Sequence, residues 1–267
     1  MFDLNGYLVL EGAIDSADLE AMNQWIDDQW HYVKQPNDAV GNSRWIGRVE
    51  TQNYGGQDGV NFQNIVDGGD VFEKLIDHPA WIDLVRKYVA ENNGLSIYEN
   101  FLNVRGPGGH LYIHSGGHFP RQYFTFRHHN TSEWMVGQIN VLMALEDIGP
   151  GDGGTVLIPG SHKVTETHPR LEVEGKKVGN LNDGRLAQTA LGMQEMHLKA
   201  GDALFFTDAV THGSSERTNE GYRRSVVYRY SPRHFRPRFN IEQSDDLLKR
   251  LTPDRRRILE PIPIRRP

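Results

Sequence analysis

MVGQINVLMAL, residues 135–145, is the stretch that decides the fold class, because its side chains alternate with the period of a β-strand. One face is wholly apolar and comprises Ile139, Val141, Met143 and Leu145. Gln138 and Asn140 fall on the opposite face. A strand of this kind packs its apolar face on other elements and turns its polar face toward a cavity or toward solvent. We expect a cavity here, with a solvated face as the alternative.

Short strand-like segments, broken by glycine and proline, continue this pattern from residue 95 onward. They are Ser96–Val104, Met135–Leu145, Thr155–Ile158, Ala203–Phe206 and Ser225–Tyr230. The glycine-rich segment Gly149–Gly154 is a typical turn between two of them. Closely spaced strands with such turns predict an all-β core, a sandwich or a barrel, with flanking helices.

Helices are expected on both sides of this core. Ser16 is expected to cap a first helix, and a second helix is predicted over Val71–Val89, where Pro79 interrupts it. The polar residues 32–64 are expected to form a loop, and Asp245–Ile258 is expected to form a C-terminal helix.

The chain shows no repeat, low-complexity tract or inter-domain linker, so we expect a single domain over residues 1–267. Its parts are N-terminal helices within 16–90, a β core over about 95–232 and a C-terminal helix over 245–258. Residues 164–194 are expected to leave the core between two strands. Long excursions of this kind often close over a binding site as a lid.

Composition excludes several classes of protein. With 37% hydrophobic and 24% charged residues, the chain has the composition of an ordinary globular protein. Its net charge of -6 argues against a nucleic acid polymer as a partner. It contains no cysteine, which leaves histidine and carboxylate as the strong metal ligands. It has neither a leader-like N-terminus nor an apolar run of membrane-spanning length, which predicts a cytoplasmic protein without a membrane partner.

Two of the 12 histidines stand in a pattern that suggests an iron site. His114-Ser115-Gly116 is followed by a distant His212 and, eleven residues later, by Arg223. Open Fe(II) sites use two histidines and one carboxylate on one face of the metal, and a His-x-Asp pair with a distant histidine supplies them. Histidines at positions 110, 114 and 118 could also form a helical zinc site, but the many glycines around them make a helix implausible.

Three segments together resemble the phytanoyl-CoA dioxygenase-like branch of the Fe(II)/2-oxoglutarate-dependent oxygenases. They are FDLNGYLVLEGAID (2–15), LMALEDIGPGDGGTVLIPGSHK (142–163) and AGDALFFTDAVTHGSSERTNEGYRRSVVYRY (200–230). The resemblance extends to about residue 232. It implies a double-stranded β-helix, which is a cupin-like jelly-roll barrel, and it implies Fe(II), 2-oxoglutarate and O2 as cofactors.

By this resemblance His114 is the first iron ligand and His212 the distal one. Arg223 is expected to bind the distal carboxylate of 2-oxoglutarate, a task that suits its planar fork. Ser214 matches a family position that hydrogen-bonds the same carboxylate. The alternation of strand residues adds further candidates for 2-oxoglutarate contacts, which are Gln138, Asn140 and Asn103. Arg224 competes with Arg223, but the two must point to opposite faces of their strand.

Gly116 stands where the family pattern has Asp or Glu. Two histidines and a bidentate 2-oxoglutarate fill four of six iron positions, so a second position stays open beside the one for dioxygen. Glycine supplies neither a ligand atom nor bulk there, and chloride could occupy the space. The pattern resembles that of the Fe(II)/2-oxoglutarate halogenases, and the leading hypothesis is a halogenase in which Gly116 provides the open halide position.

Three other interpretations of Gly116 remain open. Water could fill the position and leave a hydroxylase with a two-histidine site. A carboxylate from elsewhere, such as Asp208 or Glu133, could complete the site. The barrel could also bind a small molecule without catalysis.

Two segments interleave basic and aromatic side chains on this acidic chain, HFPRQYFTFRHHN (118–130) and SPRHFRPRF (231–239). This mixture suits a small anionic and aromatic substrate, such as a nucleotide held by phosphate contacts and stacking. The substrate-binding candidates are His118, Arg121, Arg127, His128 and Phe235. A solvated basic rim is the alternative interpretation, and a substrate tethered to a carrier protein is less favoured.

Overall fold

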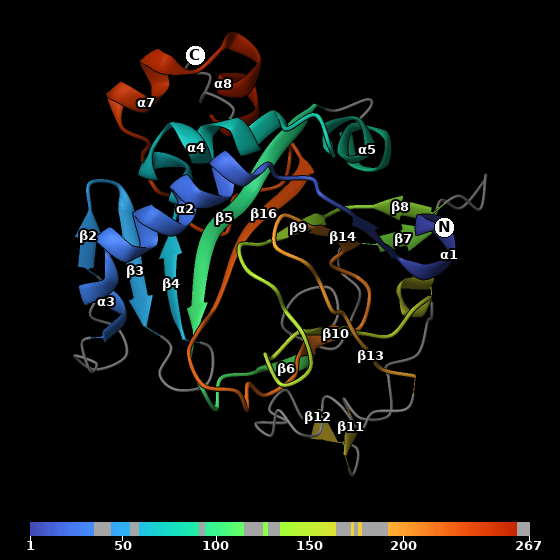
Figure 1. Ribbon diagram of the computed structural model, residues 1–267. Coiled ribbons are helices and arrows are strands. Elements are labelled where there is room, and N and C mark those ends of the chain that lie inside the picture. The colour runs from blue at the N-terminus through green and yellow to red at the C-terminus, as the bar shows by residue number, and fades with distance from the viewer. Residues whose placement is uncertain are drawn as a thin grey trace.

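The computed structural model describes residues 1–34, 44–53, 59–90, 94–114, 125–127, 134–163, 172–173, 176–177 and 192–260. Two antiparallel sheets dominate these residues, and helices cover one face of the larger sheet (Figure 1). The prediction of a mostly β fold with flanking helices is confirmed. Among the described strands the two sheets are not joined to each other, so closure into a barrel stays a prediction.

The larger sheet has eight strands, and the smaller sheet lies opposite its inner face (Figure 1). In spatial order the larger sheet consists of β1 (Tyr7–Leu10), β14 (Ala203–Thr207), β9 (Ile139–Ala144), β16 (Arg223–Pro232), β5 (Leu95–Arg105), β4 (Val60–Gln63), β3 (Val49–Asn53) and β2 (Arg44–Ile46). The smaller sheet consists of β13 (Gln194–Glu195), β10 (Thr155–Leu157), β15 (His212–Ser214) and β6 (Leu111–His114). Two short hairpin-like pairs are β7 (Thr125–Arg127) with β8 (Trp134–Val136), and β11 (Glu172–Val173) with β12 (Lys176–Lys177).

The helices come before β5 and after β16 in the chain. The α-helices are α1 (Phe2–Asn5), α2 (Ser16–Asp28), α3 (Trp30–Lys34), α4 (Asp70–Glu73), α5 (Ile82–Val85), α7 (Asp245–Arg250) and α8 (Pro253–Leu259). The structure also has the 3₁₀ helices η1 (Ile65–Gly68), η2 (Lys74–Asp77) and η4 (Ser161–Lys163) and the π-helical turn η3 (Arg86–Ala90).

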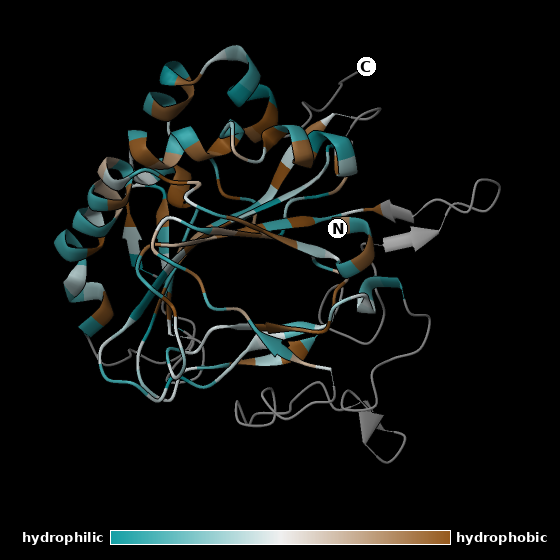
Figure 2. Ribbon diagram, turned by 45° about the vertical axis from the view of Figure 1, so that its right-hand side comes forward, coloured by the Kyte–Doolittle hydropathy of each residue, from teal (hydrophilic) through white to brown (hydrophobic). Residues whose placement is uncertain are grey.

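The main core lies between the outer face of the large sheet and these helices, where apolar residues meet in Figure 2. Ile139, Val141 and Met143 of β9 point into this core, as the alternation of residues 135–145 predicts. Hydrogen bonds also tie the helical layer to β16. The Tyr228 hydroxyl donates to the Phe72 carbonyl at 2.7 Å, and the Tyr230 hydroxyl donates to the Leu75 carbonyl at 2.7 Å.

Four predicted elements differ in detail, and local geometry explains two of them. The helix predicted over Val71–Val89 is interrupted at Pro79, as predicted, because His78 is extended before it; on each side of the break it consists of two short helical segments of different type. The helix predicted over Asp245–Ile258 is two helices, because Leu251 and Thr252 are extended and Pro253 begins the second.

The two other differences concern a cap and a strand. Asp15 caps α2 in place of Ser16, since its side chain accepts a hydrogen bond from the Asp18 N–H at 2.8 Å. The strand predicted over 135–145 is interrupted at Gly137, so that β8 pairs with β7 and β9 joins the large sheet.

The largest error of the sequence-based prediction is the loop over residues 32–64. The structure has β4, β3 and β2 there, which extend the large sheet from β5 to its edge at β2. Their sequence looks too polar for a core strand because β4 turns Asn61 and Gln63 toward the interior cavity. Much of the predicted excursion 164–194 lies outside the described residues, so its role as a lid stays a prediction.

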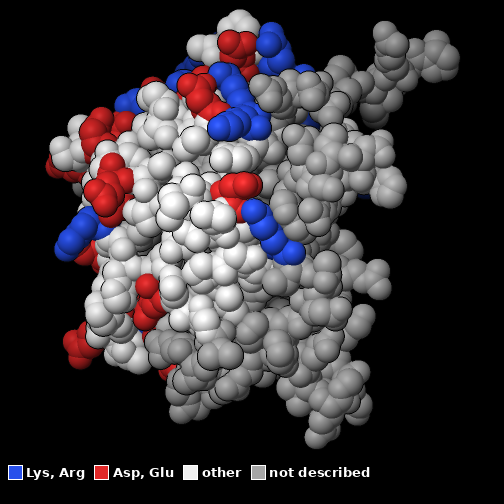
Figure 3. Space-filling view, turned by 90° about the vertical axis from the view of Figure 1, so that its right-hand side faces the viewer, with Lys and Arg blue, Asp and Glu red and all other residues white. Residues whose placement is uncertain are grey.

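Two further observations concern helix length and surface charge. Within the described part of the chain, no helix is long and apolar enough to cross a membrane. On the face shown in Figure 3, the acidic and basic side chains that are described lie interspersed.

Candidate active site

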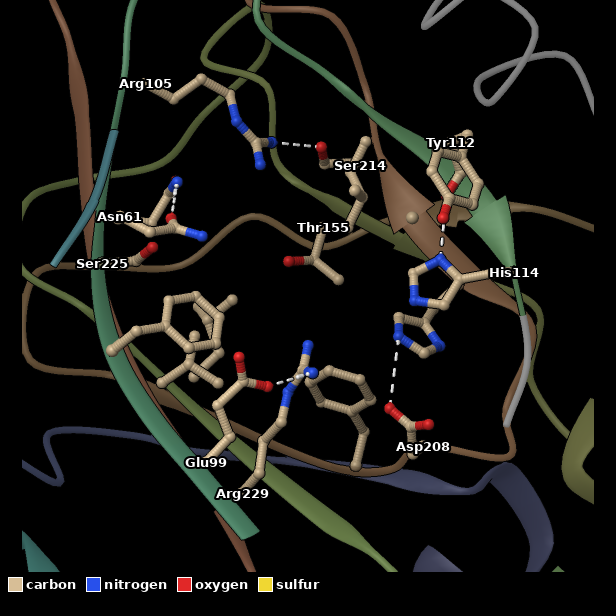
Figure 4. Close-up of a pocket in the computed structure, with 18 of the residues that line it drawn as sticks. Asn61, Glu99, Arg105, Tyr112, His114, Thr155, Asp208, Ser214, Ser225 and Arg229 are labelled. Atoms are coloured by element: carbon tan, nitrogen blue, oxygen red, sulfur yellow. Dashed lines mark hydrogen bonds and ion pairs between the residues drawn. The ribbon is translucent and has the colours of Figure 1, made fainter. Parts of the chain in front are cut away.

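A cavity of about 340 Å³ lies between the two sheets. Its walls come from β4, β5, β9, β14 and β16 on one side and from β6, β10 and β15 on the other. Figure 4 shows that His114 of β6, Arg105 of β5 and Asp208, which follows β14, point into it. The polar face predicted for residues 135–145 therefore faces a cavity, because Gln138 lies in its wall.

His114 and His212 meet because β6 and β15 are neighbours in the small sheet. The two residues are paired in register, and their ring centroids are 4.1 Å apart. Gly213 allows this close approach, since a Cβ atom there would lie 2.8 Å from the Leu111 carbonyl oxygen and 2.9 Å from that of Tyr112. Residues 98 positions apart in sequence are thus brought together by backbone pairing, as the resemblance implies.

Backbone hydrogen bonds fix the tautomer of both histidines. The Nδ1 atom of His114 lies 3.0 Å from the Tyr112 carbonyl oxygen, and that of His212 lies 2.6 Å from the Val210 carbonyl oxygen. A carbonyl oxygen only accepts, so each Nδ1 atom carries the proton and donates it. Each Nε2 atom is left with its lone pair, which is the atom and the form with which neutral imidazole binds a metal.

Burial reinforces this neutral state. Burial, and next the neighbouring His212, lower the pKa of His114 to about 3. Burial also lowers the pKa of His212, although Asp208 acts in the opposite direction. For Asp208, burial raises the pKa, but His212, Arg229, His114 and a hydrogen bond from Asn140 outweigh it and lower the pKa. At neutral pH the site therefore offers two neutral imidazoles beside one carboxylate.

Asp208 follows β14 and reaches the histidines from the large-sheet side of the cavity (Figure 4). Its Oδ1 atom is 3.9 Å from the Nε2 atom of His212, and both side chains are almost fully buried. Asn140 donates to the same oxygen at 2.9 Å, and Gln138 donates to Asn140 at 2.9 Å. Asn140 and Gln138, predicted as 2-oxoglutarate contacts, thus form a chain of hydrogen bonds behind Asp208.

A second polar group lies at the other end of the cavity. Arg105 of β5 and Arg223 of β16 are paired in register, and both are buried in the cavity wall. Arg105 donates to the hydroxyl of Ser214, and Arg223 donates to the Gly153 carbonyl and, at 3.3 Å, to Asn103. The predicted residues Arg223, Ser214 and Asn103 therefore lie together.

Arg224 points away from this group. Its guanidinium donates to Asp27 at 2.7 Å and to Asn23 at 3.1 Å, both on helix α2, and it lies over the ring of Trp30. The two arginines point to opposite faces, as the alternation along the strand requires, and Arg223 is the one that faces the cavity.

A third cluster surrounds Glu99, whose side chain is buried in the cavity wall. Arg229 donates to it at 2.7 Å and Arg238 at 3.3 Å, and Gln63 donates at 3.2 Å. Arg238 belongs to the basic segment 231–239, so one part of that segment does reach the cavity.

Several predicted site residues belong to segments that the structure does not describe. Gly116, His118, Arg121, His128 and Glu133 lie outside the described residues. Arg127 is described only as part of the β7 backbone. Their predicted roles stay predictions.

Phe235 is described, but it does not line the central cavity. A turn after β16, closed by a hydrogen bond of 2.9 Å from the Phe235 N–H to the Pro232 carbonyl, carries it to a separate hollow beside Ser96 and Ile97. The substrate contact predicted for Phe235 is therefore not seen at this cavity, because the strand ends before it.

The phytanoyl-CoA dioxygenase (PhyH) family model matches residues 2–225, which include the paired histidines and Arg223. The chain belongs to the phytanoyl-CoA dioxygenase family. This membership makes it an Fe(II)/2-oxoglutarate-dependent dioxygenase and confirms the family that the sequence resembles. A halogenase-type site within the family is not shown by the match.

Two relatives illustrate how distant the family members are. A probable phytanoyl-CoA dioxygenase of Caenorhabditis elegans is 25% identical over 240 residues, which is 86% of this chain and 73% of the relative. The dioxygenase cdmD of Talaromyces verruculosus is 31% identical over 111 residues, which is 40% of this chain and 29% of the relative.

Solved structures show the same fold at low identity. HygX from Streptomyces hygroscopicus, with nickel and 2-oxoglutarate bound, is 21% identical with a TM-score of 0.68, covering 92% of this chain and 90% of HygX. The epimerase SnoN from nogalamycin biosynthesis is 16% identical with a TM-score of 0.55, covering 88% of this chain and 82% of SnoN.

The residues present fit the iron of the phytanoyl-CoA dioxygenase family. His114 and His212 line the same cavity with unprotonated Nε2 atoms, and Asp208 adds a carboxylate beside them. Histidine and carboxylate are ligands that non-haem Fe(II) uses. In the part of the chain that the structure describes, no three such side chains converge closely enough to hold an ion without a shift of one of them.

Several cavity residues were not predicted, although strand alternation indicates some of them. Arg105 lies two residues after Asn103 and so shares its strand face, and Glu99 lies on the same face. Arg229 shares the face of Arg223 by the same rule. No comparable signal pointed to Asn61, because the strand that carries it was not predicted.

Proposed function

We propose that this member of the phytanoyl-CoA dioxygenase family is a hydroxylase that oxidises a carbon–hydrogen bond of a small molecule. The observation that carries the proposal is the pair His114 and His212, which line one cavity in register with both Nε2 lone pairs available. These two histidines would hold the iron, which would supply dioxygen activation with 2-oxoglutarate as the co-reductant. One oxygen atom enters the substrate as a hydroxyl, and the other enters the succinate that forms as CO2 leaves 2-oxoglutarate.

The chain's own residues have separate tasks in this proposal. His114 and His212 hold the metal, and their backbone hydrogen bonds keep the rings oriented. Arg223 and Arg105 would hold the distal carboxylate of 2-oxoglutarate, together with the Ser214 hydroxyl to which Arg105 donates. Asn103 orients Arg223. The apolar side chains of Phe206 and Leu142 in the same wall limit the access of water.

A hydroxylase is favoured over the halogenase that Gly116 suggests. The dioxygenase names of the family and of its relatives support oxygenation, and none of them names a halogenation. A buried carboxylate beside the two histidines also supports it, because an extra ligand reduces the room for chloride.

The substrate in this proposal is small and carries an anionic group. Among the described residues of the cavity wall, four are arginines (Arg105, Arg223, Arg229 and Arg238) and two are carboxylates (Glu99 and Asp208). The two charges of 2-oxoglutarate balance those of Fe(II), so a positive excess remains for the substrate. HygX has been crystallised with hygromycin B and SnoN with nogalamycin RO, which supports a small-molecule substrate in general.

The test is turnover by the iron-loaded protein. We expect succinate to form from 2-oxoglutarate only with Fe(II) and O2, and a screen of paired phosphorylated and unphosphorylated compounds to give a product with one added oxygen. The product should be the same in chloride-free buffer. A chlorinated product would replace this proposal by a halogenase, and 2-oxoglutarate binding without succinate would indicate a non-catalytic binding protein.

A further inference from the structure

Asp208 lies beside His212, one of the two proposed iron ligands, although the family pattern puts the carboxylate elsewhere. That pattern has it two residues after the first histidine, where this chain has Gly116. Asp208 instead precedes the distal histidine by four residues, in the turn between β14 and β15. Figure 4 shows its carboxylate directed at the imidazole below His114.

The closest atoms of Asp208 and His212 are the Asp208 Oδ1 and the His212 Nε2, and both are hydrogen-bond acceptors. The His212 Nδ1 proton is donated to the Val210 carbonyl at 2.6 Å, so the Nε2 atom carries a lone pair. That atom lies 3.9 Å from the Asp208 Oδ1 atom, which is too long for a hydrogen bond. Two lone pairs that face each other in a buried place favour a cation between them.

The surroundings of Asp208 are also those of a ligating carboxylate. Asn140 donates to its Oδ1 atom at 2.9 Å, and Gln138 in turn orients Asn140. Hydrogen bonds of this kind orient metal-binding carboxylates and are part of most metal sites. The polar face of residues 135–145 therefore acts on the site through Asp208.

We infer that Asp208 supplies the third protein ligand of the iron and replaces the carboxylate that is missing at Gly116. Neighbouring ligands of an octahedral ion, each at roughly 2.1 Å, are about 3 Å apart, so the separation of 3.9 Å closes by about 1 Å on metal binding. Rotation of the short Asp208 side chain provides this shift. The inference rests on the proposed function, because it requires iron at His114 and His212.

This assignment changes what the iron site can do. Two histidines, one carboxylate and a bidentate 2-oxoglutarate fill five of six positions. One position is left for dioxygen, and none is left for a halide. Asp208 thereby accounts for hydroxylation by a chain that lacks the carboxylate of the family motif.

The test measures metal binding without turnover. Co(II) alone is titrated anaerobically into the wild type, Asp208→Asn, Glu99→Gln and His212→Ala, by calorimetry and by visible absorption. Asn has the shape of Asp and can still accept from Asn140, and unfolding curves confirm that each variant is folded. We expect Asp208→Asn to weaken Co(II) binding by at least about tenfold and to change the spectrum. Glu99→Gln, which alters another buried carboxylate of the same cavity, should leave both unchanged.

Two other results separate this inference from the proposed function. If His212→Ala weakens Co(II) binding but Asp208→Asn binds like the wild type, Asp208 is not a ligand and the histidine site stands. If the wild type binds Co(II) no better than His212→Ala does, the proposed metal site itself fails. Chloride added with 2-oxoglutarate should alter the spectrum of Asp208→Asn only; a chloride-dependent change in the wild type would overturn the inference without any variant.

Discussion

The two faces of β16 are both buried, but they serve different purposes. Arg223, Ser225, Val227 and Arg229 point into the cavity, whereas Arg224, Val226, Tyr228 and Tyr230 point toward the helices. On the helical side, the two tyrosine hydroxyls bond backbone carbonyls of the segment 70–77. On the cavity side, guanidinium and hydroxyl groups surround space for ligands. One strand thus separates a face that stabilises the fold from a face that performs the chemistry.

The same division applies to β9. Ile139, Val141 and Met143 pack on the helical layer, while Gln138 lines the cavity and Asn140 holds Asp208. Changes on the inner face should therefore alter turnover or ligand binding and leave stability almost unchanged. Changes on the outer face should have the reverse effect.

The largest expected effect is at the two histidines, which face the cavity from the small sheet. Replacing His114 or His212 with alanine should lower succinate formation by more than about 100-fold, since loss of a ligand exceeds the cost of losing its supporting hydrogen bonds. The free energy of unfolding should change by only about 1 kcal/mol, because each ring makes one backbone hydrogen bond. Turnover assays and denaturant unfolding measure the two quantities. Full turnover by either variant would remove the histidine pair from the proposed site.

The next effect is on the outer face. Trp81 is fully buried against the sheet, and its indole N–H donates to the Tyr230 hydroxyl at 3.0 Å. Trp81→Ala should lower the free energy of unfolding by about 3–5 kcal/mol, because it leaves a large cavity. In the fraction that stays folded, the Kd for 2-oxoglutarate should match that of the wild type. A large change in that Kd would show that the two faces are coupled.

Two adjacent arginines compare the faces directly. Arg223→Gln should raise the Kd for 2-oxoglutarate by about 10- to 100-fold, since it loses a charge-assisted interaction of about 1.5–3 kcal/mol. Arg224→Gln is the matched control, because its guanidinium pairs with Asp27 on helix α2. It should leave that Kd within about twofold and cost at most about 1 kcal/mol of stability, as a partly exposed ion pair does. Calorimetric titration of both variants checks this, and equal effects would contradict the division of the strand.

The sequence predicted those parts of the molecule in which local alternation and the final fold agree. The strands of the β core, the pairing of His114 with His212 and the inward direction of Arg223 all follow from period-two patterns or from the resemblance. The strands β2–β4 were missed, and for β4 the reason is that Asn61 and Gln63 make its cavity face polar. Alternation alone cannot distinguish such a strand from a loop.

Asp208 shows a different limit. Its position in a turn after β14 carries no periodic signal, and only the pairing of β14 with β9 brings it to Asn140. Sequence reasoning could name Asp208 as a carboxylate within reach of the iron, together with Glu133, but could not choose between them. That choice depends on the packing of one sheet against the other.

The smallest expected effect compares two hydroxyl groups on β16. The Tyr228 hydroxyl donates to the Phe72 carbonyl at 2.7 Å, so Tyr228→Phe leaves a buried acceptor unpaired and should cost about 1 kcal/mol of unfolding free energy. Ser225 faces the cavity, and among the described residues its buried hydroxyl oxygen has no hydrogen-bond partner. Ser225→Ala should therefore change the free energy of unfolding by less than about 0.5 kcal/mol. Denaturant unfolding of both variants, with equal slopes, measures the difference. Equal losses would mean that the inner face also stabilises the fold, and the contrast between the two faces would then hold for binding alone.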